Sequence, residues 1–127
     1  FQIFGTFDDA GRLTGFSTQP DPRAEKWPEG VYESTCTPAE WLGAWRVNRW
    51  NTARIRCVGK YPQITTWING LKVCHFDGAA CTHPGYDKDR VFGILGRSGS
   101  IGLQVHGGKS WPKGTVCRWR NIRIKEL

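Results

Sequence analysis

The chain has 127 residues and a formal net charge of +7, with 39% hydrophobic and 23% charged residues, which is typical of a globular protein. This length predicts one domain, residues 1–127, and no run of about 18 apolar residues exists, so no membrane partner is expected. Six of the 18 basic residues follow position 108, but no nucleic-acid motif accompanies them. We interpret them as a solvated edge strand, and nucleic acid is not expected as a partner.

The N-terminal part predicts short strands around a long loop. Residues 1–7 alternate as a strand does, and residues 18–30 hold three prolines among charged residues, which predicts an irregular loop. A short strand is expected over residues 30–34. Thr37, followed by proline and then by Glu40, is a typical helix start, and the predicted helix is short, ending near Gly43.

The middle of the chain predicts a run of paired strands. Residues 50–59 form one predicted strand, whose inward-facing side is expected to carry Ala53, Ile55 and Cys57. Residues 63–70 form its partner and end in Asn69-Gly70, a strong signal for a tight hairpin turn. The chain then runs back as a strand over residues 71–76.

The C-terminal third predicts one short helical turn and two more strands. The turn is expected within residues 86–95, where Gly93 argues against a long helix. Residues 100–108 alternate strictly, with three aliphatic residues on one face and glycine, Gln104 and His106 on the other. Residues 119–127 form the last predicted strand. Many strands, few helices and dense turn signals predict an all-β sandwich.

Five cysteines are present, and none forms a Cys-x-x-Cys pair, which argues against a structural zinc site. Cys57 and Cys117 occupy apolar positions of predicted strands and are expected to be small core residues. Cys74 and Cys81 flank a short loop. In an oxidising compartment they could form a local disulfide, and otherwise they stay as thiols.

Four blocks of sequence, in order, resemble the 3-keto-disaccharide hydrolase family: 50–55, 66–70, 101–107 and 119–127. The resemblance implies an all-β, concanavalin- or laminarinase-like jelly-roll β-sandwich with one or two short helices. The family's N-terminal block has no counterpart here, so we expect the chain to match the C-terminal two-thirds of the family domain. The missing strands would leave open edges that a second chain could complete. By analogy alone, such a domain is expected to be exported to the periplasm or the extracellular space.

The resemblance also implies a glycoside or oligosaccharide ligand that has been oxidised at C3 of the sugar. A C3 ketone acidifies the hydrogen on C2, so a base can remove it and the C1 substituent can leave by β-elimination before water adds back. Such a site needs a base with a pKa near neutrality, an acid for the leaving oxygen and donors for the enolate oxygen. Laminarinase-like jelly rolls carry a Glu-x-Asp-x-x-Glu run instead, and this chain has none.

His106 is the candidate base or metal ligand, because it projects from the polar side of its predicted strand. Glu33 is the candidate carboxylate partner, on a strand within a family-like block. The alternatives are a surface histidine and a solvated glutamate without a role. A divalent metal on His106 and Glu33 is conceivable, although two ligands do not define a site. His75 and His83 are read as lying in or near a loop and receive no role.

Further polar and aromatic residues are candidate sugar contacts, since an indole packs on the apolar face of a pyranose. Four of them are assigned to one face of the strand over residues 63–70, which could equally be a solvent face: Gln63, Thr65, Trp67 and Asn69. Gln104 shares the polar face of His106. Weaker candidates are Gln2 at the start of the chain and the pair that follows the Gly107-Gly108 bend, Lys109 and Trp111.

Three functions of different classes remain open from the sequence. The first is a glycoside-cleaving hydrolase or lyase that acts on 3-keto-sugars. The second is a non-catalytic carbohydrate-binding module, which would keep glycan binding when His106 is changed to alanine. The third is a structural or interaction subunit whose sheets are completed by partner chains, and it would show no affinity for sugar.

Overall fold

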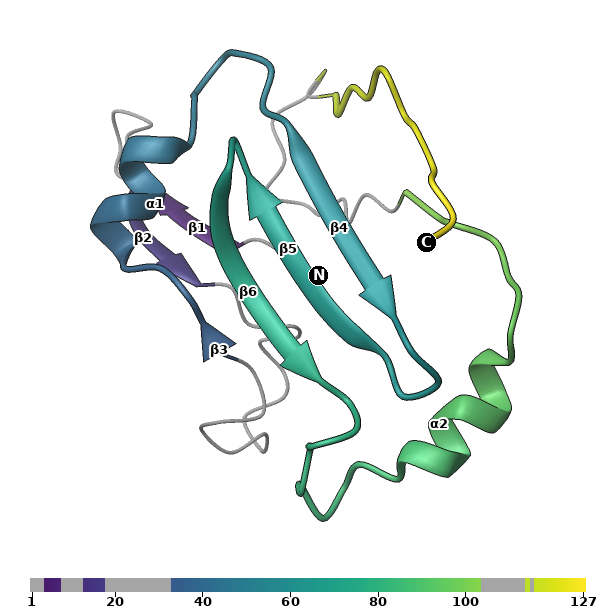
Figure 1. Cartoon of the computed structure of the whole chain (residues 1–127). Coiled ribbons are helices and arrows are strands. Elements are labelled where there is room, and N and C mark those ends of the chain that lie inside the picture. The colour runs from purple at the N-terminus through teal and green to yellow at the C-terminus, as the bar shows by residue number, and fades with distance from the viewer. Residues whose placement is uncertain (1–3, 8–12, 18–32, 104–113, 115) are drawn as a thin grey trace.

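The computed structural model describes residues 4–7, 13–17, 33–103, 114 and 116–127, and these are mostly sheet with two short helices (Figure 1). The described elements, in chain order, are β1 (Phe4–Phe7), β2 (Leu13–Ser17), β3 (Glu33–Ser34), α1 (Pro38–Ala44), β4 (Ala53–Val58), β5 (Gln63–Ile68), β6 (Leu71–Asp77) and α2 (Lys88–Leu95). The all-β prediction is therefore confirmed. The predicted strands 1–7 and 30–34 correspond to β1 and β3, as far as those stretches are described.

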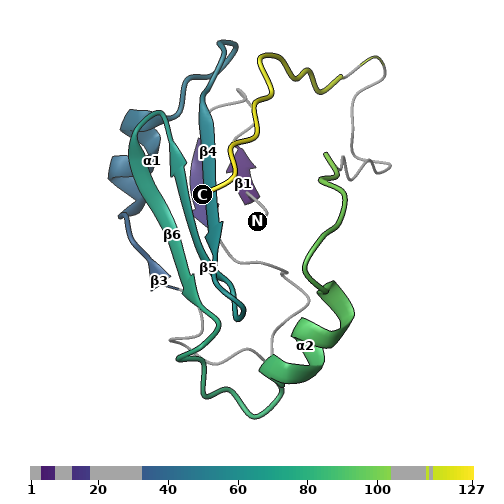
Figure 2. The same cartoon turned by 45° about the vertical axis from the view of Figure 1, so that its right-hand side comes forward.

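The strands form two antiparallel sheets. β1 pairs with β2, while the larger sheet has the strand order β3-β6-β5-β4. β4 is thus at one edge, and none of the described residues pairs with its outer side. Helix α1 contacts both sheets, through β2 and β6. Figure 2 shows α1 beside β6, and α2 beyond the far end of the sheet.

The turn between β5 and β6 has the geometry that Asn-Gly predicts. Asn69 has a φ of 50° and Gly70 a φ of 91°, which are the positive values of a type I′ turn. This turn pairs Ile68 with Leu71. Further along the hairpin the register shifts, so that Thr66 pairs with Cys74 and one extra residue of β6, Val73, is accommodated in a β-bulge.

Helix α1 begins as the sequence predicts. The Thr37 hydroxyl accepts from the backbone N–H of Glu40, and the Glu40 carboxylate accepts from the backbone N–H of Thr37, which completes a capping box. The Thr37 N–H holds the pKa of Glu40 below its ordinary value. The predicted helical turn over residues 86–95 is α2, capped by Asp87, whose carboxylate accepts from the Arg90 N–H.

A small core lies where α1 meets the β5–β6 hairpin. Its buried members are Trp41, Ile68, Val73 and Cys74, with Trp41 only 1% exposed. Trp41 stacks on Trp45, with ring centroids 5.3 Å apart. α1 is therefore held against the sheet chiefly by one buried indole.

Two strand predictions are wrong for the residues that are described. Residues 100–103 and 119–127 form no strand, and their aliphatic side chains are exposed, including Ile101, Leu103 and Ile124. An alternating segment becomes a strand only when a neighbour accepts its hydrogen bonds, and none of the described residues does so here. Residues 104–108 of the first predicted strand lie outside the described part.

The prediction that Ala53, Ile55 and Cys57 of β4 face inward is also wrong, because all three residues are exposed. β4 is an edge strand, and no described element covers that side of it. Cys117, predicted as a core residue, is exposed as well. The disulfide alternative for Cys74 and Cys81 is not realised. Both are free thiols, and burial raises the pKa of Cys74.

Candidate functional site

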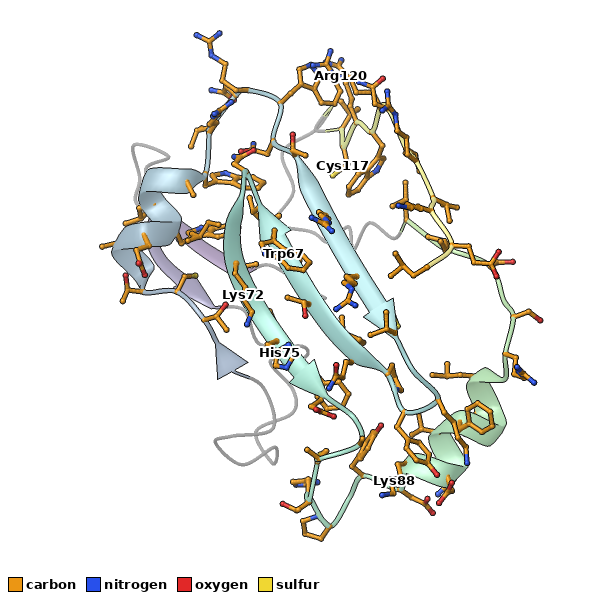
Figure 3. All side chains as sticks on the ribbon, in the orientation of Figure 1. Trp67, Lys72, His75, Lys88, Cys117 and Arg120 are labelled. Carbon is orange, nitrogen blue, oxygen red and sulfur yellow. The ribbon has the colours of Figure 1, made fainter. Side chains whose placement is uncertain are left out.

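One side of the four-stranded sheet, which we call the front face, carries charged, polar and aromatic side chains. Paired residues of neighbouring strands share a face, so the register defines its members. Figure 3 shows Trp67, Lys72 and His75 together on this side. The members on β4, β5 and β6 are Arg54, Arg56, Val58, Gln63, Thr65, Trp67, Lys72, His75 and Asp77.

The central row of the front face crosses all four strands. Arg56 of β4 pairs with Thr65 of β5, Thr65 pairs with His75 of β6, and His75 pairs with Glu33 of β3. The Thr65 hydroxyl lies 3.0 Å from His75 Nδ1, and Thr65 is only 8% exposed. The row therefore places an imidazole, oriented by a hydroxyl, next to the strand position of the candidate carboxylate.

The row next to the hairpin turn is aromatic and cationic. Trp67 is half-buried and pairs with Arg54 on one side and Lys72 on the other. The Arg54 guanidinium lies 5.0 Å from the centroid of the indole, a cation–π contact that restrains both side chains. The indole of Trp67 is thus flanked by a positively charged residue on each neighbouring strand.

The row at the opposite end is an internally bonded pair. Gln63 Nε2 donates to Asp77 Oδ2 over 2.7 Å, and Asp77 Oδ1 accepts from the backbone N–H groups of Ala79 and Ala80. These donors, with Gln63 first, hold the pKa of Asp77 below its ordinary value. Asp77 therefore stays ionised, and it anchors the turn that follows β6.

Asn69, predicted as a sugar contact, lies in the hairpin turn rather than on a row of the front face. Its amide donates to the Ala44 carbonyl and to Asn51 Oδ1, both over 2.7 Å, and its oxygen accepts from the Thr52 N–H over 2.8 Å. The side chain thus joins the turn to the end of α1 and to the start of β4. These bonds use both groups of the side-chain amide.

Several predicted site residues lie outside the described part of the chain: Gln2, Gln104, His106, Lys109 and Trp111. Glu33 is described as the strand partner of His75. Among the predicted contacts, the structure brings Gln63, Thr65 and Trp67 together on the front face.

His75 is the residue that sequence reasoning missed. A regular hairpin closed by Asn69-Gly70 would pair His75 with Ile64 and place it on the opposite side from Trp67. The bulge at Val73 shifts the register by one residue and pairs His75 with Thr65 instead. The available signal was that His75 lies inside the predicted strand 71–76, and reading it as a loop residue was wrong.

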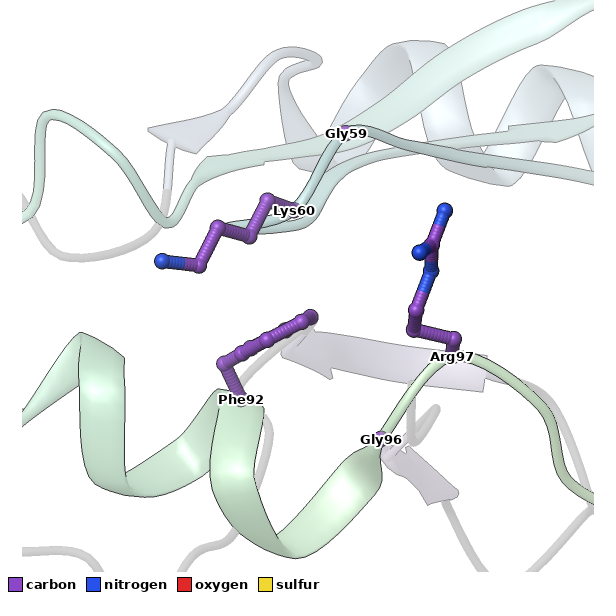
Figure 4. A pocket seen from close by; sticks show the side chains of 5 residues that line it. All are labelled: Gly59, Lys60, Phe92, Gly96 and Arg97. Carbon is purple, nitrogen blue, oxygen red and sulfur yellow. The ribbon is translucent and has the colours of Figure 1, made fainter.

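The described residues contain no group of three or more metal-binding side chains, and none of their helices has the length and apolarity needed to span a bilayer. A pocket of about 500 Å³ lies between α2 and the turn joining β4 to β5, and its lining residues are Gly59, Lys60, Phe92, Gly96 and Arg97 (Figure 4). The Tyr61 hydroxyl raises the pKa of Lys60, which also pairs with Asp89 at 3.4 Å. The pocket shares no residue with the front face.

Comparison with known proteins gives one match. The family model for a 3-keto-alpha-glucoside-1,2-lyase-like domain matches residues 2–125. No curated protein matches the chain, and no solved structure does. The family model covers nearly the whole chain, so the resemblance seen in the sequence is confirmed and the function is carbohydrate-related. The chain belongs to the family of 3-keto-alpha-glucoside-1,2-lyase-like domains.

Proposed function

We propose that the chain is a jelly-roll domain that binds a 3-keto-glycoside on the front face and cleaves it by β-elimination followed by hydration. The observation that carries the proposal is the central row, in which Thr65, His75 and Glu33 follow one another across three strands. Beside this row lies the half-buried indole of Trp67 with the Arg54 guanidinium over its ring, and a pyranose could pack on the exposed part of this pair. Family membership supports the substrate class.

The reaction is an elimination followed by the addition of water. A base takes the C2 proton, the C–H electrons form an enolate with the C3 ketone, and the C1–O bond then breaks as the leaving oxygen is protonated. Water next adds across the C1–C2 double bond, placing a hydroxyl on C1 and a hydrogen on C2. An imidazole suits the base because its ordinary pKa lies near neutrality.

His75 is our candidate for the base, and Thr65 would keep one of its ring nitrogens engaged over 3.0 Å so that the other faces the substrate. Glu33, its strand partner, is proposed as the acid–base partner. His106, proposed from the sequence, is the rival base. The positive charge of Lys72, on the same strand as His75, would stabilise the enolate oxygen.

The test uses one purified chain and two substrates. The chain is incubated with a 3-keto-glucoside and with its unoxidised parent, with and without EDTA, and release of the aglycone is followed. Turnover of the keto form alone, lost in His75→Ala and kept in His83→Ala, would support His75 as the base. His83 is a suitable control because it lies in the loop after β6 and accepts the Gly85 N–H.

The other outcomes of this test are equally informative. Loss of turnover in His106→Ala but not in His75→Ala would transfer the role to His106. Loss of turnover in EDTA would support the divalent metal proposed for His106 and Glu33. No turnover of either substrate by the folded wild-type chain would overturn the enzymatic proposal.

A non-catalytic carbohydrate-binding role is the second candidate, and the Trp67 row favours it. That row consists of an indole and two cations and holds no carboxylate, so it is suited to binding rather than to acid–base chemistry. Under this alternative, glycan binding persists in His75→Ala and His106→Ala and is lost in Trp67→Ala. Isothermal titration with the unoxidised glycoside distinguishes the two roles.

A further inference from the structure

We propose that the glycoside recognised by the front face carries a carboxylate, as a uronic acid does, and that Arg54 and Arg56 bind that group. This inference deepens the proposed function and rests on it, because it assigns the substrate class of the same face. It starts from the charges on β4 and β6 rather than from the family.

The cations of the front face are available to a ligand. Arg54, Arg56 and Lys72 are all exposed, and they form no ion pair with any side chain in the described part of the chain. Arg54 contacts the Trp67 ring through its guanidinium, which leaves the edge of that group to donate hydrogen bonds. The carboxylate of the front face on β6, Asp77, is already held by Gln63 and by two backbone N–H groups. The β4 side of the face thus has positive charge without a described counter-ion.

The spacing of the two arginines suits one sugar-sized anion. They are two residues apart on one strand, so their Cα atoms are separated by about 7 Å and their side chains share a face. A guanidinium can donate two parallel hydrogen bonds to a carboxylate, which a lysine ammonium cannot do. A carboxylate between Arg54 and Arg56 could therefore accept hydrogen bonds from both guanidinium groups.

Trp67 fixes where the sugar ring would lie relative to that anion. Its indole is 5.0 Å from the Arg54 guanidinium, so a pyranose packed beside the indole has its rim within reach of the arginines. In a uronic acid the carboxylate is attached to C5, on the rim of the ring and away from C2 and C3. Binding it on β4 leaves the reacting carbons free to face His75, two strands away.

The position of the arginines gives the face a direction. Arg54 and Arg56 lie on β4, at one edge of the sheet, and His75 lies on β6, two strands away. An acidic ligand is attracted to the positive edge, so its carboxylate end is directed to β4.

The experiment compares a glucuronide with the glucoside that has the same aglycone, by isothermal titration at two salt concentrations. We expect the wild-type chain to bind the glucuronide about tenfold more tightly, a value typical of a hydrogen bond to a charged group. Arg54→Gln and Arg56→Gln should each remove most of that preference, measured within each variant as the ratio of its glucuronide affinity to its glucoside affinity. Arg90→Gln on α2 is the matched control, because it removes one exposed positive charge away from the front face.

Each remaining outcome decides the inference. Equal affinity for the two sugars, or an equal effect of Arg90→Gln and Arg56→Gln, overturns it. A sulfated glycoside bound as tightly as the glucuronide would show a general anion site. Tighter binding of single-stranded DNA than of the glucuronide would show a nucleic-acid surface. Either result also overturns the carboxylate inference. If a glutamine variant does not fold, Arg56→Lys decides, because it keeps the charge and loses the fork.

Trp67→Ala separates this inference from the proposed function. If the front face binds sugar, that variant weakens both the glucoside and the glucuronide. If it weakens neither, the site itself has been misplaced. If it weakens both while the wild-type chain binds the two equally well, the front face stands and only the carboxylate assignment fails.

Discussion

Thr65 Oγ1 and His75 Nδ1 lie 3.0 Å apart on neighbouring strands, and the two residues are in register only because a bulge at Val73 precedes His75 on β6. Thr65 is nearly buried beneath the front face while His75 is half-buried. The hydroxyl therefore engages one ring nitrogen from the neighbouring strand, while part of the His75 side chain stays exposed.

Thr65→Val should impair the imidazole without removing it. The variant takes away the oxygen next to His75 Nδ1, so we expect the tautomer distribution of His75, measured by ¹⁵N NMR, to change. If His75 is the base, turnover of a 3-keto-glucoside should fall about tenfold in Thr65→Val and by about 10²-fold or more in His75→Ala. Thr65→Ser keeps the hydroxyl and should restore both readouts. An unchanged tautomer ratio in Thr65→Val would contradict this role.

Thr66→Val should stabilise the chain. Thr66 is 1% exposed, and among the described residues its hydroxyl has no hydrogen-bond partner. Valine has nearly the same shape and removes a buried polar group, so the free energy of unfolding should rise by about 1 kcal/mol. Urea denaturation measures the change. Thr82→Val, at an exposed position, is the control and should change stability by less than about 0.5 kcal/mol. A loss of stability in Thr66→Val would be the opposite of this expectation.

Asn69→Ala should be strongly destabilising. It removes three side-chain hydrogen bonds and places alanine at a φ of 50°, so we expect a loss of about 2–4 kcal/mol. Asn69→Gly tolerates the positive φ and loses only the hydrogen bonds, so its loss should be smaller. Equal losses in the two variants, measured by thermal unfolding, would mean that backbone strain contributes nothing.

Gly78→Ala should destabilise the turn after β6. A Cβ at this buried position would lie 2.7 Å from the Tyr86 hydroxyl and 2.9 Å from the Pro62 carbonyl, and the carbonyl cannot easily move. We expect a loss of about 1–3 kcal/mol. Gly43→Ala in α1 is the matched control: its Cβ would meet nothing within 4 Å, so it should stabilise the helix by up to about 1 kcal/mol. Comparing the two melting temperatures tests both expectations.

Much of the fold could be predicted because its signals are local. The start of α1 is defined by a capping box between residues close in sequence, Thr37 and Glu40. The turn at Asn69-Gly70 depends only on the positive φ angles that these two residues can adopt. The face shared by Gln63, Thr65 and Trp67 follows from the period of a strand.

What failed depends on contacts that a local pattern does not contain. The bulge that moves His75 to the front face results from packing along β6, and Val73, its extra residue, is fully buried. The 119–127 pattern alternates correctly, but the described residues offer no strand to pair with it. Sequence periodicity predicts a face, whereas the register decides which residues share it.

Acid should destabilise the chain through its hydrogen-bonded carboxylates. Gln63 lowers the pKa of Asp77, and Tyr61 lowers that of Asp89. A carboxyl whose pKa is lower in the folded than in the unfolded state contributes stability above its unfolded pKa, and that contribution is lost as the pH falls through the folded value. We therefore expect stability to decline below about pH 4. Asp77→Asn together with Asp89→Asn should make the decline shallower in a pH series of urea melts, and an unchanged slope would contradict this assignment.

The two arginines of β4 also bear on how copies of the chain meet in solution. β4 is an edge strand with no described partner on its outer side, and its exposed Ile55 makes it a template for pairing with another copy. If two such strands met in antiparallel register, their guanidinium groups would face one another across the new pair, and like charges there repel. The charges of Arg54 and Arg56 therefore oppose edge-to-edge pairing of β4 between copies of the chain. Any ligand or mutation that neutralises these charges would also favour self-association.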